Sequence, residues 1–184
     1  MQKNNVYRMT LSAMFLALAL ALPLITGQLP QMGMAFLPMH LPVLLCGFIC
    51  GWPWGLAVGL IAPLLRSVLF GMPPLMPTAL TMTFELAAYG AFAGLLYKRL
   101  PRKPASVYIA LVGAMLLGRV VWGLASLAVY GLFLGDRFTA VLFLSGAFVN
   151  AWPGIIVQLV LIPLILFALE RAKLTSAGSK VAAE

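Results

Sequence analysis

Six apolar segments follow one another along the chain, separated by short polar or proline-rich breaks. They cover residues 10–26, 38–51, 55–71, 77–97, 105–133 and 139–169. A helix needs about 20 apolar residues to cross a bilayer, so the pattern predicts an all-α integral membrane protein with six transmembrane helices. The second segment is short for a full crossing. The sixth is long enough to tilt, or to bend at Pro153 or Pro163.

Composition supports the membrane assignment. Of the 184 residues, 63% are hydrophobic and 9% are charged, whereas a soluble domain carries roughly a quarter charged residues. The basic, then apolar, N-terminus resembles a signal peptide, but further apolar segments follow, so we interpret it as the first span. We expect one membrane domain over residues 1–172 and a polar, disordered cytoplasmic tail over residues 173–184.

The positive charges predict the orientation of the spans. They gather near the N-terminus, in residues 98–103 after the fourth segment, and in the C-terminal region. Because Lys and Arg concentrate in cytoplasmic loops, all three clusters are expected inside, with both termini. The net charge of +8 therefore reflects topology. Nucleic-acid binding is not expected, since no basic face interleaved with aromatic residues lies outside the apolar segments.

Three charged residues lie within the apolar segments: Arg66, Glu85 and Arg119. With the expected orientation, all three fall between the outer surface and the middle of the bilayer. A charge at this depth is costly, so such groups face the bundle interior or a wet cavity. Similar depth predicts that Arg66 pairs with Glu85, which leaves Arg119 without an acidic partner. The alternative is a purely structural ion pair, with the other arginine satisfied by backbone carbonyls.

The neighbours of these charges favour a small-molecule pocket over a purely structural arrangement. Tyr89 follows Glu85 by four residues and Trp122 follows Arg119 by three, spacings that place each pair on one helix face. A few polar groups among aromatic side chains are typical of ligand sites. Residues 27–38, rich in proline and apolar side chains, are predicted to form a lid. The candidate substrate-binding residues are Arg119, Glu85, Tyr89, Trp122, Asn150, Arg66, Gln31 and His40.

Neither a metal nor catalysis is expected. His40 has no second imidazole, thiolate or nearby carboxylate in sequence, which makes a poor metal site, so we assign it a hydrogen-bonding role. Cys46 and Cys50 are interpreted as small packing residues. The chain contains no nucleophile elbow, zinc-protease motif or nucleotide-binding loop. It is therefore not predicted to be an enzyme, and no cofactor is expected.

Small residues recur along the first segment, at Ala13, Ala17 and Ala21. A spacing of four places them on one face, where small side chains let another helix approach closely in lipid. This face is a candidate partner interface. The alternative is a chance repeat in an alanine-rich helix.

These features together resemble the substrate-binding S component of energy-coupling-factor (ECF) vitamin transporters. The resemblance is carried by the alanine face, the lid-like first outer loop and the polar set in the outer half of the later segments. The stretches "MHLPVLLCGFICGWPWGLAVGLIAPLLRSVLFGMPP" and "FELAAYGAFAGLLY" are similar to the pantothenate-type or uncharacterised branch. The resemblance extends to about residue 172.

The resemblance implies a fold, a function and partners. The fold would be the six-helix S-component bundle in a prokaryotic plasma membrane. The chain would capture a vitamin or related micronutrient outside the cell, working with a membrane coupling subunit, which the alanine face would contact, and two ATPase subunits. We expect a carboxylate or another hydrogen-bond-accepting group on the substrate, held partly by Arg119, and pantothenate fits best. The alternatives are a stand-alone carrier, which would be expected to show repeated halves, and a membrane scaffold.

Overall fold

The computed structural model describes residues 2–25, 35–101, 103–135 and 138–172, and within them the chain is helical, without strands. Short π-helical turns, labelled η, interrupt or extend the α-helices. In chain order the elements are α1 Gln2–Ile25, α3 His40–Cys50, α4 Trp52–Phe70, η1 Leu75–Ala79, α5 Leu80–Arg99, α6 Pro104–Val129, η2 Tyr130–Leu134, α7 Ala140–Leu144, η3 Ser145–Val149 and α8 Trp152–Arg171.

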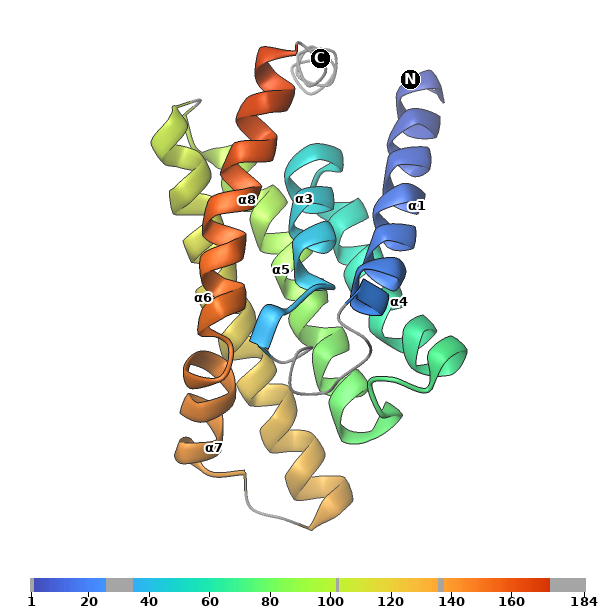
Figure 1. The fold of residues 1–184 in the computed structure, drawn as a ribbon, viewed down its shortest axis with the longest axis vertical. Helices are drawn as coiled ribbons and strands as arrows, with labels where there is room; N and C mark the ends of the chain where they lie inside the picture. Colours follow the sequence, from blue (N-terminus) through green and yellow to red (C-terminus); the bar gives the residue numbers. More distant parts are fainter. Residues whose placement is uncertain (1, 26–34, 102, 136–137, 173–184) are drawn as a thin grey trace.

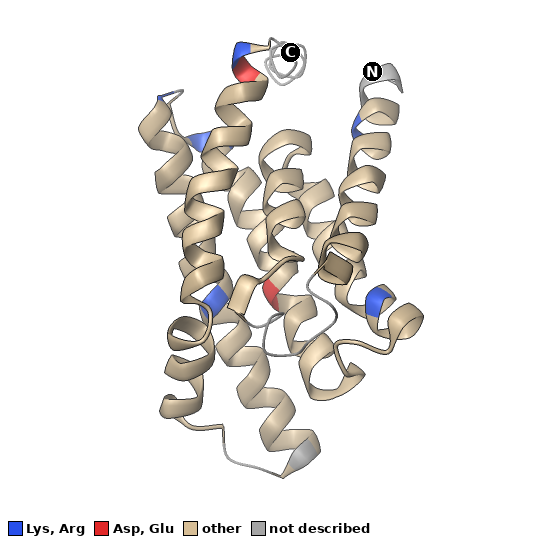
Figure 2. Ribbon diagram, in the orientation of Figure 1, with Lys and Arg blue, Asp and Glu red and all other residues tan. Residues whose placement is uncertain are grey.

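The helices form one elongated bundle, and the start of α1 and the end of α8 lie at the same end of it (Figure 1). The end of α5 and the start of α6 lie at this end too, while the end of α4 and η2 lie at the opposite end. Figure 2 shows the charged positions in two groups. One group is at the end with the termini. The other is on α4, α5 and α6, nearer the opposite end.

Glycine and proline mark the helix boundaries. Gly51, with φ of 94°, separates α3 from α4, and Pro53 occupies the first turn of α4, where a missing N–H costs nothing. Gly71, with φ of 68°, ends α4 in the left-handed conformation that glycine adopts without steric cost. These residues explain why a nearly continuous apolar sequence folds into separate helices.

Among the described residues, five helical stretches are long and apolar enough to cross a membrane: Asn5–Ile25, Trp52–Phe70, Leu75–Arg99, Pro104–Phe133 and Trp152–Arg171. Helix α3 has 11 residues, about 16 Å of helix, or roughly half the hydrocarbon thickness. The predicted all-α membrane architecture is thus confirmed for five spans, and the second apolar segment forms a shorter helix than a full crossing requires.

The sixth predicted segment is divided. Helix α7 continues into η3, which ends at Val149. Helix α8 begins at Trp152 with Pro153 in its first turn. The bend expected near Pro153 is therefore confirmed, because proline is tolerated at a helix start but not deep in a preceding helix. Pro163 lies inside α8 without ending it. The predicted tail, residues 173–184, lies outside the described residues.

Glycines allow α3, α4 and α5 to pack backbone against backbone. A Cβ atom added at Gly90 of α5 would collide with the backbone of Gly55 in α4, and one at Gly59 would collide with the backbone at Leu86. Gly47 of α3 lies against the Gly90 carbonyl in the same way. Close approach through small residues is how helices gain dispersion energy in lipid. The contact fixes which face of α5 points at α4.

Candidate functional site

Two buried charged side chains, Arg119 and Glu85, meet His40 between α3, α5 and α6. The Arg119 Nη1 atom of α6 lies 2.7 Å from the Glu85 Oε1 atom of α5 and donates a hydrogen bond to it. The His40 Nε2 atom, at the start of α3, lies 3.5 Å from the same oxygen. All three residues are almost fully buried, at 6%, 2% and 1% exposure respectively. One carboxylate thus joins three helices.

Tyr89 completes this group, one turn beyond Glu85 on the same face of α5. Its ring meets the His40 ring edge to face, with 5.2 Å between the centroids. A Cβ atom at Gly118 of α6 would collide with the Tyr89 ring, so the glycine provides the space that the ring occupies. We call His40, Glu85, Tyr89 and Arg119 the buried polar cluster.

The predicted pairing of Arg66 with Glu85 is wrong. Arg66 of α4 is buried, donates a hydrogen bond from Nη1 to the Leu20 carbonyl of α1, and lies over the Phe70 ring at 5.0 Å. The reason is helix orientation. The face of α5 that meets α4 carries Leu86 and Gly90, and Glu85 is turned about 100° away from Leu86. Similar depth in the membrane did not bring the two side chains together.

The pairing of Arg119 with Glu85 gives the site a different charge balance from the one expected. The expectation that Arg119 lacks an acidic partner is also wrong, because Glu85 neutralises it. The buried polar cluster contains one carboxylate and one guanidinium, and so has no surplus charge when His40 is neutral. It retains unmet hydrogen-bonding capacity. Within the described part of the chain, His40 Nδ1, the Tyr89 hydroxyl and Arg119 Nη2 are buried without a hydrogen-bond partner.

Two predicted site residues are engaged elsewhere. Trp122 stacks on Phe143 at 6.0 Å between centroids and meets Phe138 edge to face at 5.7 Å. Asn150 is exposed, in the break before α8, and its Nδ2 atom donates to the Ser145 hydroxyl at 3.3 Å. Residues 27–34 of the predicted lid, which include Gln31, lie outside the described residues. The structure thus groups His40, Glu85, Tyr89 and Arg119, and groups none of Arg66, Trp122 and Asn150 with them.

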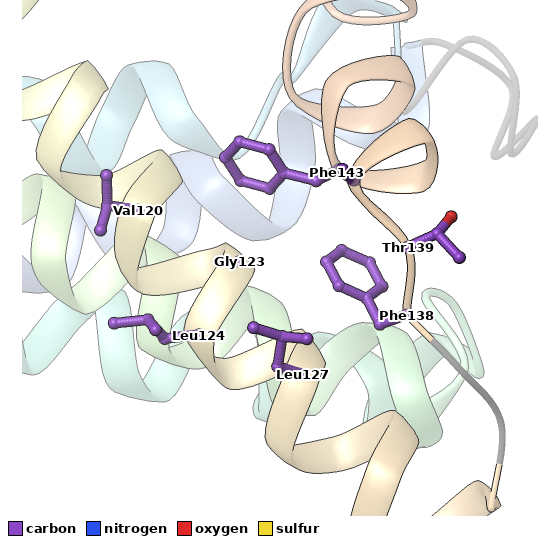
Figure 3. Close-up of a pocket in the computed structure, with 8 residues that line it drawn as sticks. Val120, Gly123, Leu124, Leu127, Phe138, Thr139 and Phe143 are labelled. Atoms are coloured by element: carbon purple, nitrogen blue, oxygen red, sulfur yellow. The ribbon is translucent and has the colours of Figure 1, made fainter.

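An apolar groove lies beside Trp122, between α6 and the segment that leads into α7 (Figure 3). The rings of Phe138 and Phe143 line one side, and Leu124 and Leu127 of α6 line the other. Thr139 supplies the polar side chain in a lining that is otherwise apolar. The groove therefore lacks the charged and polar groups that distinguish the buried polar cluster.

Residues that could hold a metal ion are not gathered in the structure. Among residues 2–25, 35–101, 103–135 and 138–172, no three His, Cys, Asp or Glu side chains form a group suited to a metal. Cys46 and Cys50 are free and buried, and the Cys46 thiol lies 3.6 Å from the Ser12 hydroxyl.

The alanine face of α1 is exposed. Ala13, Ala17 and Ala21 lie on the outer side of the helix. The opposite side, with Phe15 and Ala19, is buried against the bundle. The face is therefore exposed on the described structure and is accessible to another helix.

Comparison with known families identifies the class of protein. The model of the ECF transporter substrate-specific component matches residues 7–166, and the chain belongs to this family. It is therefore a multi-pass membrane protein of the substrate-specific type in ECF transport. Comparisons with curated proteins and with solved structures give no match.

Proposed function

We propose that this chain is the substrate-binding subunit for uptake of a vitamin or related small micronutrient, and that the buried polar cluster holds the substrate's polar group. The observation that carries the proposal is the burial of Glu85 and Arg119 beside polar atoms that have no partner within the described residues. Ionisable residues inside membranes are costly, and they mark substrate paths more often than static structure. Family membership supplies the transport role.

The substrate group at this site is proposed to be polar and uncharged. Glu85 already neutralises Arg119, so the charge argument for a carboxylate, and with it for pantothenate, no longer applies. The expectation that the substrate carries a hydrogen-bond-accepting group remains supported, because the Nη2 donor of Arg119 has no partner within the described residues. A charged ligand would have to displace Glu85 from Arg119 or bring a counter-charge, each at a cost in free energy.

The partners are proposed to be a membrane coupling subunit and two cytosolic ATPase subunits. The exposed positions of Ala13, Ala17 and Ala21 support a helix-to-helix contact on α1 with the coupling subunit. The basic residues at the end that holds both termini support a cytoplasmic location for that end, in a prokaryotic plasma membrane. On this orientation the buried polar cluster lies in the half of the bundle nearer the outside.

A growth experiment tests this function. Cells that lack the gene are grown on media each limited in one vitamin, and the parent chain or a variant is supplied on a plasmid. We expect one limiting vitamin to prevent growth of the deletion strain, and the parent chain to restore it when the coupling and ATPase subunits are present. Restoration in a strain that lacks the coupling subunit would instead support a stand-alone carrier. Normal growth of the deletion strain on every limited medium would contradict the proposal.

A further inference from the structure

Gln158 of α8 is buried, at 1% exposure, and its amide has no hydrogen-bond partner within the described residues. Both the Nε2 donor and the Oε1 acceptor are unpaired. Burying an amide without hydrogen bonds costs free energy, and native proteins leave few polar groups in this state. The Gln158 amide therefore needs a hydrogen-bond partner that the described residues do not provide.

Gln158 faces the interior of the bundle. Gly154, Gln158, Ile162 and Leu166 are buried residues of α8 spaced by four, and so form one stripe on the helix. Ile162 and Leu166 belong to the hydrophobic core. At the other end of the stripe, Gly154 lies against the backbone of residues 35 and 36, shortly before His40. Gln158 thus lies one turn from each of these contacts.

Helix α8 packs against α3 and α6, the helices that carry His40 and Arg119. Unpaired buried polar atoms thus occur on four helices of one bundle: His40 on α3, Tyr89 on α5, Arg119 on α6 and Gln158 on α8. The guanidinium can only donate, whereas the amide offers both a donor and an acceptor. Together these groups offer hydrogen-bond donors and an acceptor on helices that pack against one another.

We propose that Gln158 is a specificity-determining residue that hydrogen-bonds the substrate through both atoms of its amide. The recognised group then carries a donor beside an acceptor, as in a carboxamide, a urea or a pyrimidinedione ring, and it has no net charge. This inference rests on the proposed function, in which the buried polar cluster holds a micronutrient. An ordered water molecule is the competing occupant, and the experiment below separates the two.

The test compares the full-length parent with Gln158→Met, a variant of similar length that cannot make these hydrogen bonds. Each purified protein is stripped of bound compounds and incubated with an equimolar mixture of nicotinamide, riboflavin, pyridoxine, panthenol, nicotinate, pantothenate and thiamine. Retained compounds are then counted by native mass spectrometry. We expect the parent to retain an uncharged compound with adjacent donor and acceptor, and Gln158→Met to retain about a tenth as much or less.

Two further measurements keep the test decisive. The melting temperature of stripped Gln158→Met should equal or exceed that of the parent, since removing an unpaired buried amide costs nothing. A lower melting temperature would show that the amide has a partner in the protein, and would overturn the inference. The matched control is Thr83→Val, because the Thr83 hydroxyl is buried but already donates to the Ala79 carbonyl at 2.8 Å. Its retention should equal that of the parent.

The outcomes separate this inference from the function on which it rests. Equal retention by Gln158→Met and the parent overturns the role of Gln158, favours a water molecule at the amide, and leaves the proposed function standing. Retention of only a charged compound by the parent overturns the uncharged substrate class. Retention of no compound by the parent contradicts the proposed function, and this inference with it.

Discussion

The Arg119 guanidinium of α6 and the Glu85 carboxylate of α5 form a direct ion pair, 2.7 Å between Nη1 and Oε1, inside the bundle. His40 approaches the same carboxylate oxygen from α3. In a low-dielectric interior, each charge would be costly without the other. The pair therefore links α5 to α6. The two charges also cancel, so a substrate meets a site without net charge.

Removing one member of the pair should destabilise the protein. We expect Glu85→Gln to lower the free energy of unfolding by about 3–5 kcal/mol, because the buried Arg119 loses its counter-charge. Unfolding of the purified protein in detergent would measure the change. The double variant Glu85→Gln/Arg119→Met serves as the control and should lose less than the sum of the two single variants. Additive losses would mean that the two side chains are not coupled.

The glycine contact between α4 and α5 should be intolerant of even a methyl group. We expect Gly90→Ala to lower the free energy of unfolding by about 1–3 kcal/mol, since its Cβ would meet the backbone of Gly55 with no flexible side chain to move. The matched control is Gly131→Ala in η2, where nothing lies within 4 Å of the added atom. That change should stay within about 0.5 kcal/mol. Equal effects of the two variants would contradict the close packing.

The exposed alanine face of α1 should matter for transport and not for binding. We expect Ala13→Leu and Ala17→Leu to reduce uptake by cells at least tenfold, because bulky side chains hold a partner helix away. Substrate retention by the purified variants should match the parent. Val112→Leu provides the control, as it alters an exposed position on α6 and should leave uptake unchanged. Loss of retention in the alanine variants would show that this face supports the site itself.

Much of the fold could be predicted from hydrophobic segments because membrane spans need length and apolar character above all. The sequence also contained the information about which helix faces meet. The glycine pairs Gly55–Gly59 and Gly90–Gly94 identify the α4–α5 contact, and Glu85 lies off that face. The predicted pairing of Arg66 with Glu85 rests on depth in the membrane, and depth alone does not determine which side chains face each other.

The candidate site was predicted in part. His40, Glu85, Tyr89 and Arg119 were all expected to bind substrate, and the structure brings them together, although binding itself stays a prediction. The three-residue spacing predicts that Trp122 shares a face with Arg119. Three residues turn through about 300°, however, so the two side chains point about 60° apart. This difference lets Trp122 pack against Phe138 and Phe143 instead. Gln158 is visible in the sequence as a polar residue within the sixth apolar segment, but its burial without a partner is known only from the structure.

The central claim, that the buried polar cluster binds the substrate, is tested most directly by the affinity of Tyr89→Phe. This variant removes one hydroxyl that has no hydrogen-bond partner among the described residues, and leaves the ring packed against Gly118. Isothermal titration calorimetry with the compound identified by mass spectrometry should show a loss of about 1 kcal/mol, or roughly five- to tenfold in affinity, with an unchanged melting temperature. An affinity equal to that of the parent would contradict the account and place the substrate elsewhere in the bundle.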